Sequence, residues 1–419
     1  MHRISFSLLV IFIVSTFCVQ AQSNSEDHIK EGNELCDEGK YAEAIETYRL
    51  VHENDSNYSM VLAEIAMAYL GMEKYDSALV AIDQGLALNG SSRCHLLRTK
   101  GVVYKYMGQP EKSIETYRDA IKEYPFEYLL HYSLGASYVD TKDFREAQKC
   151  FQEALRCNPF HASSHMYLGN LAARQKQYTR AMLSLETFLA LEPASSRSNR
   201  VLVFIENLSN NYMDTTQGCF IDPIDDNSVF KEIDHYFRAR IVLTDRYALP
   251  IEFNASLVKQ SKMIMETLPY DRANDEKCDD FWAQMYFPFF YAIYHGGHIS
   301  PFLYTLLRST GQDDVIKYNE KNEKELDALY GLGGYLSIIQ KHRRTNIIGE
   351  EKLYDFAYYD NGKVYSIGNK NSSGNKDGEW RYYHNNGEIS AEGYYNDGKK
   401  SGEWRYFLND GSIKSQGEN

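Results

Sequence analysis

The stretch of sequence that decides the fold reads GASYVDTKDFREAQKCFQEALRCNP and runs from Gly135 to Pro159. It places a small residue at Gly135 and another at Ala147, with an aromatic residue three positions before Ala147. A large apolar residue, Phe151, follows four positions after Ala147. This spacing predicts two antiparallel helices, because small residues let helices approach, a large one fills the groove between them, and proline stops the second helix.

The same pattern recurs at a nearly fixed step. Twelve positions before each anchor stands another small residue, and four positions after it stands a large apolar one. A hairpin of this kind cannot bury its apolar face alone, so neighbouring copies are expected to stack into a solenoid. The five anchors, separated by 34, 35, 34 and 34 residues, are Ala44, Ala78, Ser113, Ala147 and Ala181.

This pattern resembles the tetratricopeptide repeat, in five copies over residues 25–195. The resemblance implies an α-solenoid whose concave surface, lined by the first helix of each copy, holds a protein or peptide partner. The candidate contacts in the third to fifth copies are Arg98, Lys105, Tyr132, Met166 and Asn170. We expect Arg98 and Tyr132 to be exposed, and the local basic charge to favour an acidic segment. The alternative is a groove that binds nothing specific or packs on later helices of the same chain.

Residues 1–21 predict export. A short basic start precedes an apolar stretch over 4–14, and a small-x-small cleavage site ends at Ala21. The apolar stretch is shorter than the ~20 residues that a membrane span needs. We expect cleavage after Ala21, with lipidation of Cys18 as the alternative. The protein is therefore expected in a bacterial periplasm, at the cell surface or secreted, without stable insertion in a membrane.

Residues 196–351 lose the 34-residue step but keep helical periodicity, as at Val201, Ile205 and Leu208. We expect a divergent helical domain that continues or caps the solenoid. His295 and His298 flank two glycines, and this spacing of three is not the spacing of four that a metal-binding helix uses. The sequence therefore predicts a turn between two helices there, and no metal site.

No nucleophile elbow, phosphate loop or dinucleotide fingerprint occurs in the chain. We therefore expect no enzymatic activity and no cofactor. The alternative is an envelope hydrolase or carbohydrate-active protein, with its site between residues 196–351 and the tail.

The tail, residues 352–419, carries a second repeat with a step of 24. Gly-Glu-Trp-Arg-Tyr around Trp380 recurs around Trp404, and the Asn-Gly dipeptide at 386–387 is matched by Asp-Gly at 410–411, at the same step. Asn-Gly between aromatic strands indicates a hairpin, because both turn positions need φ > 0. The tail resembles MORN-type repeats of the bacterial, antitoxin-like variant, which implies a small β-meander. Trp380 and Trp404 are expected either to face a partner or to belong to a structural extension of the scaffold.

The chain is acidic, with 45 Lys and Arg against 58 Asp and Glu and a formal charge of −13. This balance disfavours nucleic acid as a partner, because Lys and Arg carry most phosphate binding. Cys150 and Cys157 lie seven residues apart on one expected helix, which is too far for a disulfide between them. The sequence thus predicts a mainly α protein that acts as an exported scaffold for protein partners.

Overall fold

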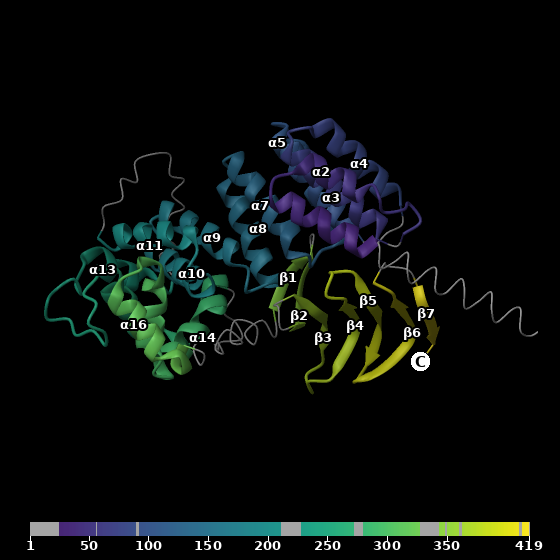
Figure 1. Cartoon of the computed structure of the whole chain (residues 1–419). Helices are drawn as coiled ribbons and strands as arrows, with labels where there is room; N and C mark the ends of the chain where they lie inside the picture. Colours follow the sequence, from purple (N-terminus) through teal and green to yellow (C-terminus); the bar gives the residue numbers. More distant parts are fainter. Residues whose placement is uncertain are drawn as a thin grey trace, which may run out of the picture. The chain divides into compact units, whose positions relative to one another are not determined.

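The computed structural model describes residues 25–55, 57–88, 92–210, 228–271, 280–326, 343–347, 350–359, 363–409 and 413–418. The expected signal peptide, with Ala21 and Cys18, lies outside these residues. Helices come first along the chain and strands last, as the change of periodicity predicts (Figure 1). The chain divides into two compact units, one of Met1–Pro125, Arg381–Tyr394 and Lys400–Asn419, the other of Phe126–Trp380 and Tyr395–Lys399.

The helices of the first unit form hairpins. A helix described over residues 25–37 precedes α2, and α3 packs on α4 as α5 packs on α6. The first helices of neighbouring hairpins, α3 and α5, also contact each other, so the hairpins stack. The bounds are α2 Tyr41–Tyr48, α3 Tyr58–Gly71, α4 Tyr75–Ala87, α5 Arg93–Tyr106 and α6 Pro110–Glu123.

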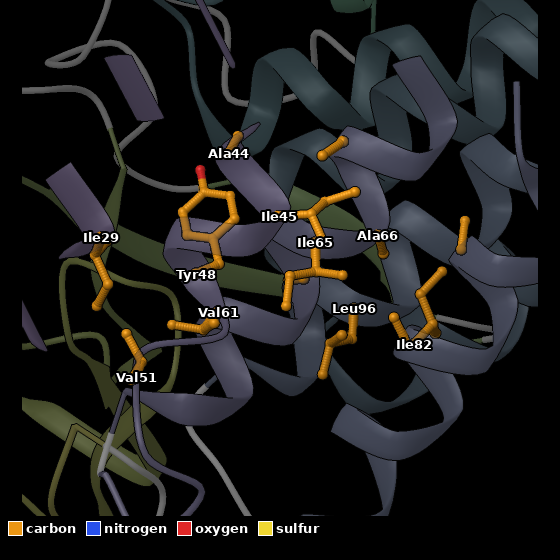
Figure 2. Close-up of a cluster of buried hydrophobic side chains, with 14 of the residues drawn as sticks. Ile29, Ala44, Ile45, Tyr48, Val51, Val61, Ile65, Ala66, Ile82 and Leu96 are labelled. Atoms are coloured by element: carbon orange, nitrogen blue, oxygen red, sulfur yellow. The ribbon is translucent and has the colours of Figure 1, made fainter. Parts of the chain in front are cut away.

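The contact that joins the two helices of a hairpin is the one that the sequence pattern predicts. A Cβ atom built on Gly101 would lie 2.4 Å from the ring of Tyr117, so only a hydrogen fits between the helices there. A Cβ atom built on Gly135 would likewise lie 2.9 Å from the ring of Phe151. All five anchors, Ala147 among them, are fully buried. Figure 2 shows the resulting core of the first hairpins, in which side chains from α2 to α5 meet.

The second unit continues with two more hairpins, α7 with α8 and α9 with α10, followed by helices without a repeat. The later helices α11, α12, α14 and α15 all contact α10, and every residue from Ala181 to Leu189 is buried. They therefore cover the outer side of the last hairpin. The bounds of the paired helices are α7 Tyr128–Asp140, α8 Phe144–Cys157, α9 Ala162–Arg174 and α10 Tyr178–Leu191. Those of the covering helices are α11 Ser196–Ser209, α12 Lys231–Ala239, α13 Ser256–Thr267, α14 Phe281–His295, α15 Ile299–Leu306, η2 Leu307–Thr310 and α16 Asp313–Lys321.

The histidine pair lies in the predicted turn. Helix α14 ends at His295 and α15 begins at Ile299, and Gly297 adopts a left-handed φ of +77° that allows the chain to reverse there. His295 is exposed and His298 is half-buried. The two histidines thus belong to a helix connection.

The strands form an antiparallel sheet in the order of the sequence, β1 to β7. Strand β1 pairs with β2, and the other six strands, β2 to β7, make up the predicted β-rich tail. In the second unit β2 also reaches the fourth hairpin, where the Tyr358 hydroxyl donates to the Arg156 carbonyl at 2.9 Å. The bounds are β1 Arg343–Ile347, β2 Glu350–Tyr358, β3 Val364–Lys370, β4 Lys376–Tyr383, β5 Ile389–Asn396, β6 Lys399–Phe407 and β7 Ile413–Glu418.

Trp380 and Trp404 occupy equivalent environments at the 24-residue step. Their side chains are 3% and 1% exposed, and each ring covers a glycine of the preceding strand, Gly368 or Gly393. The lysine four positions before each tryptophan lies 4.3 Å from its ring centroid. Both rings therefore pack within the sheet. Their contact with a partner stays a prediction, as does the alternative of a structural role in the scaffold.

Candidate functional site

The five predicted contact residues in the helices lie on the first helices of their hairpins, as expected, but in two units. Arg98 and Lys105 belong to α5 in the first unit. Tyr132 belongs to α7, and Met166 and Asn170 belong to α9, in the second unit. All five side chains are half-buried, so the expected exposure of Arg98 and Tyr132 is corrected. Their role in binding stays a prediction.

The basic charge around Arg98 is compensated by carboxylates. Arg93 pairs with Glu123 at 2.8 Å, and Lys100 Nζ lies 2.8 Å from an oxygen of Asp83. Burial raises the pKa of the Glu64 carboxyl, and the positive charge of Arg98 opposes that rise. The expectation of an acidic ligand rested on this local charge, and the pairing removes most of its support.

Tyr132 is half-buried because it belongs to an aromatic cluster. Its ring centroid lies 4.7 Å from that of His161, 5.8 Å from that of Tyr167 and 5.9 Å from that of Phe151. Burial raises the pKa of Tyr132, chiefly through desolvation. Removing this ring would therefore disturb packing as well as any binding, and a loss of binding in such a variant would be ambiguous.

Asn170 is partly engaged within its own helix, because its amide Nδ2 donates to the carbonyl of Met166 at 2.8 Å. The side-chain carbonyl of Asn170 is the acceptor that a partner's donor would meet. The exposed part of Met166 would add a flexible apolar contact. This pair thus offers a modest polar and apolar surface on α9.

A cavity of about 490 Å³ in the first unit was not anticipated from the sequence. Three tyrosines line it, Tyr41, Tyr75 and Tyr106, together with two carboxylates, Glu64 and Glu73. Met67, Ala68, Leu70, Cys36 and Gly71 complete the lining. The cavity is therefore aromatic and apolar on its walls and acidic in charge.

Burial affects the ionisation of two groups that line the cavity, Glu64 and Cys36. Burial raises the pKa of the Glu64 carboxyl, and the Arg98 guanidinium acts in the opposite direction. The same carboxylate contributes to the raised pKa of the Cys36 thiol, which burial raises most. A signal for Glu64 existed in the sequence, since it is the only charged residue in the helix Tyr58–Gly71.

Two further ionisable groups are buried where the covering helices meet the fifth hairpin. Glu186 in α10 is fully buried, accepts a hydrogen bond from the Ser261 hydroxyl at 2.6 Å, and has a pKa raised by desolvation to about 8. His165 in α9 bonds the Tyr286 hydroxyl and the Pro159 carbonyl, and burial lowers its pKa to about 4. Because the Pro159 carbonyl can only accept, Nε2 of the neutral His165 carries the proton and Nδ1 accepts from Tyr286.

Within the described part of the chain, no cluster of three or more His, Cys, Asp or Glu side chains is placed to hold a metal ion. None of the described helices has the length and apolar character needed to cross a membrane. Cys150 and Cys157 are both buried, and no disulfide joins them.

Comparison with protein families identifies the helical repeats. The tetratricopeptide repeat model matches residues 132–196, and the model of the Psidin N-terminal TPR repeats region matches residues 28–162. These matches do not confirm MORN-type repeats in the tail, so that assignment stays a prediction. The comparisons thus support tetratricopeptide repeats in the helical part of the chain.

Curated relatives and solved structures are similar only in part. A TPR repeat-containing protein of Methanocaldococcus jannaschii is 27% identical over 170 residues, which are 32% of this chain and 30% of the relative. Human tetratricopeptide repeat protein 6 is 24% identical over 31% of this chain and 25% of its own length. The chain therefore spans less than a third of these relatives.

Among solved structures, Pseudomonas aeruginosa PilF is 18% identical with a TM-score of 0.40, covering 46% of this chain and 86% of that chain. A thermophilic TPR protein of Thermus thermophilus is 16% identical with a TM-score of 0.37, covering 42% and 95%.

Proposed function

We propose that the chain is an exported scaffold of the bacterial cell envelope whose helical repeats hold a protein partner, and that it is not an enzyme. Proteins with tetratricopeptide repeats generally mediate protein–protein interactions. The observation that carries the proposal is the small-to-large contact repeated in each hairpin, as between Gly101 and Tyr117. It builds stacked helices that leave a cavity of about 490 Å³, large enough for side chains of a partner.

We further propose that the tail consists of MORN-type units that extend the scaffold. The equivalent settings of Trp380 and Trp404, each packed on a glycine of the preceding strand, support this proposal. Such packing stabilises a sheet, and in this proposal the two tryptophans have a structural role.

The scaffold function is tested by chemical crosslinking of the full chain in intact cells with an amine-reactive reagent, followed by affinity capture. The expected result is one protein recovered in amounts comparable to the chain, with crosslinks at Lys105. Lys105→Arg is the matched control, because it keeps the charge but cannot react. Recovery of intramolecular crosslinks alone would contradict the proposal.

Export makes a separate prediction about the mature N-terminus. We expect mass spectrometry of the cell-envelope or secreted protein to find a chain that begins at Gln22 and carries no lipid, because the small-x-small site ends at Ala21. An Ala21→Arg variant should accumulate unprocessed. A chain that retains Met1, or one that begins with an acylated Cys18, would show that the predicted cleavage is wrong.

A further inference from the structure

We propose that the cavity of the first three repeats receives a basic side chain, arginine or lysine, from an extended segment of the protein partner. This inference rests on the proposed scaffold function and adds the chemistry of the partner. It reverses the sign of the ligand charge that the sequence alone favours.

The first argument is the charge of the lining. Glu64 and Glu73 are the charged residues that line the cavity, and both are acidic. In the part of the chain that the structure describes, no group donates a hydrogen bond to the Glu64 carboxylate. Arg98 acts on Glu64 through charge but does not line the cavity. A half-buried carboxylate without a donor is best satisfied by a cation that brings its own N–H groups.

The second argument is the direction of the helices. Cys36, Gly71 and Tyr106 line the cavity, and they lie in the last turns of the helix over 25–37, of α3 and of α5. The C-terminal end of a helix carries a partial negative charge from the aligned dipoles of its peptide groups. Three such ends therefore add to the field of the two carboxylates, and an anionic ligand would be repelled.

The third argument is the shape and chemistry of the walls. Tyr41, Tyr75 and Tyr106 present aromatic rings, which attract cations through their π faces. Tyr106 is 63% exposed and stands at the rim, where a partner can reach it. Met67 and Leu70 supply apolar surface for the methylene stem of a lysine or arginine. An acidic net charge of −13 for the whole chain also attracts a basic segment.

The test uses the full chain and two fluorine-labelled peptides of glycine, serine and alanine, one with a central arginine and one with citrulline in its place. Fluorine NMR titration measures weak binding directly. Citrulline keeps the shape of arginine but carries no charge. We expect the arginine peptide to bind about tenfold more tightly, the difference typical of a hydrogen-bonded charge. Higher salt should reduce that difference.

Variants of the chain locate the effect. Glu64→Gln keeps the volume of the side chain and should weaken binding of the arginine peptide about tenfold or more. Glu111→Gln, an exposed control in α6, should leave that binding unchanged. Arg98→Ala removes a cation that competes for Glu64 and should strengthen binding of the arginine peptide about two- to fivefold, because solvent weakens the repulsion between the two charges. If Glu64→Gln fails to fold, Tyr106→Ala replaces it as the test. This exposed substitution removes an aromatic ring and should weaken binding of the arginine peptide about fivefold.

Equal binding of the arginine and citrulline peptides would overturn the proposal. So would a folded Glu64→Gln chain that binds within twofold of wild type, or weaker binding by Arg98→Ala. Failure here differs from failure of the scaffold function. If wild type and Glu64→Gln recover the same partner equally in the crosslinking experiment, the scaffold stands and the cavity is not its site. If the arginine peptide binds but no partner is recovered, the cavity binds a basic side chain and the scaffold function is contradicted.

Discussion

Replacing Ala147 with arginine is expected to lower the free energy of unfolding by roughly 2–5 kcal/mol. Ala147 is fully buried in α8, on the helix that packs against α7. An arginine side chain would overpack that contact and bring a charge into a position without a partner. Denaturant unfolding of the full chain, followed by far-UV circular dichroism, measures the loss.

The control for this variant is Lys149→Ala, on the exposed side of the same helix. Its ion pair with Glu146, at 2.7 Å, is solvent-exposed, and such pairs contribute about 0–1 kcal/mol. Because a solenoid is stabilised by contacts between neighbours, hydrogen exchange should quicken first in α7 and α8. Unchanged unfolding of Ala147→Arg would mean that the anchor positions do not face the helix contacts.

The helical repeats could be predicted because the same spacing of small and large residues recurs five times in the sequence. Gly101 with Tyr117 and Gly135 with Phe151 are related by one spacing, and the structure places each pair in contact. A single such pair would be a coincidence that many folds allow. Recurrence at 34 or 35 residues leaves stacked hairpins as the simple way to bury every apolar face.

The surroundings of the predicted site residues could not be derived in the same way. Period-two alternation predicts that Trp380 lies on one face of its strand. It does not predict whether that face is covered, because this depends on Gly368 of the neighbouring strand. The charge environment of Arg98 likewise includes Glu64, which lies 34 residues earlier in the previous repeat. The cavity arises where three helix ends meet, and no local pattern specifies that meeting.

The covering helices were harder still to predict, because residues 196–351 contain no repeat. Even so, a lone acidic residue in an apolar helix was a usable signal. Glu186 interrupts the apolar run of α10, and the structure buries it against Ser261. One of its carboxyl oxygens, Oε2, has no hydrogen-bond partner. A group in this position should make the stability of this region depend on pH.

The direction of that dependence follows from the pKa. Folding raises the pKa of Glu186 from 4.5 to about 8, because the charged form is desolvated. Between these values the folded state holds a proton that the unfolded state releases. The stabilising contribution is therefore complete below about pH 4.5 and is lost as pH rises through about 8. The free energy of unfolding should fall by up to about 1.4 kcal/mol per pH unit within that window.

Glu186→Gln should remove this dependence. Glutamine keeps the shape of the protonated acid and can accept from Ser261, so the variant should gain up to about 3 kcal/mol at pH 7 relative to wild type. Hydrogen exchange of α10 and α13, followed from pH 5 to 8 by mass spectrometry with correction for the intrinsic rate, measures the change locally. Glu232→Gln, at an exposed position in α12, should behave as wild type. A wild-type stability that is flat across this range, or a Glu186→Gln chain that is less stable at pH 7, would show that the carboxyl is ionised in the folded protein. The covering helices would then have to relax enough to admit water or a cation at Glu186.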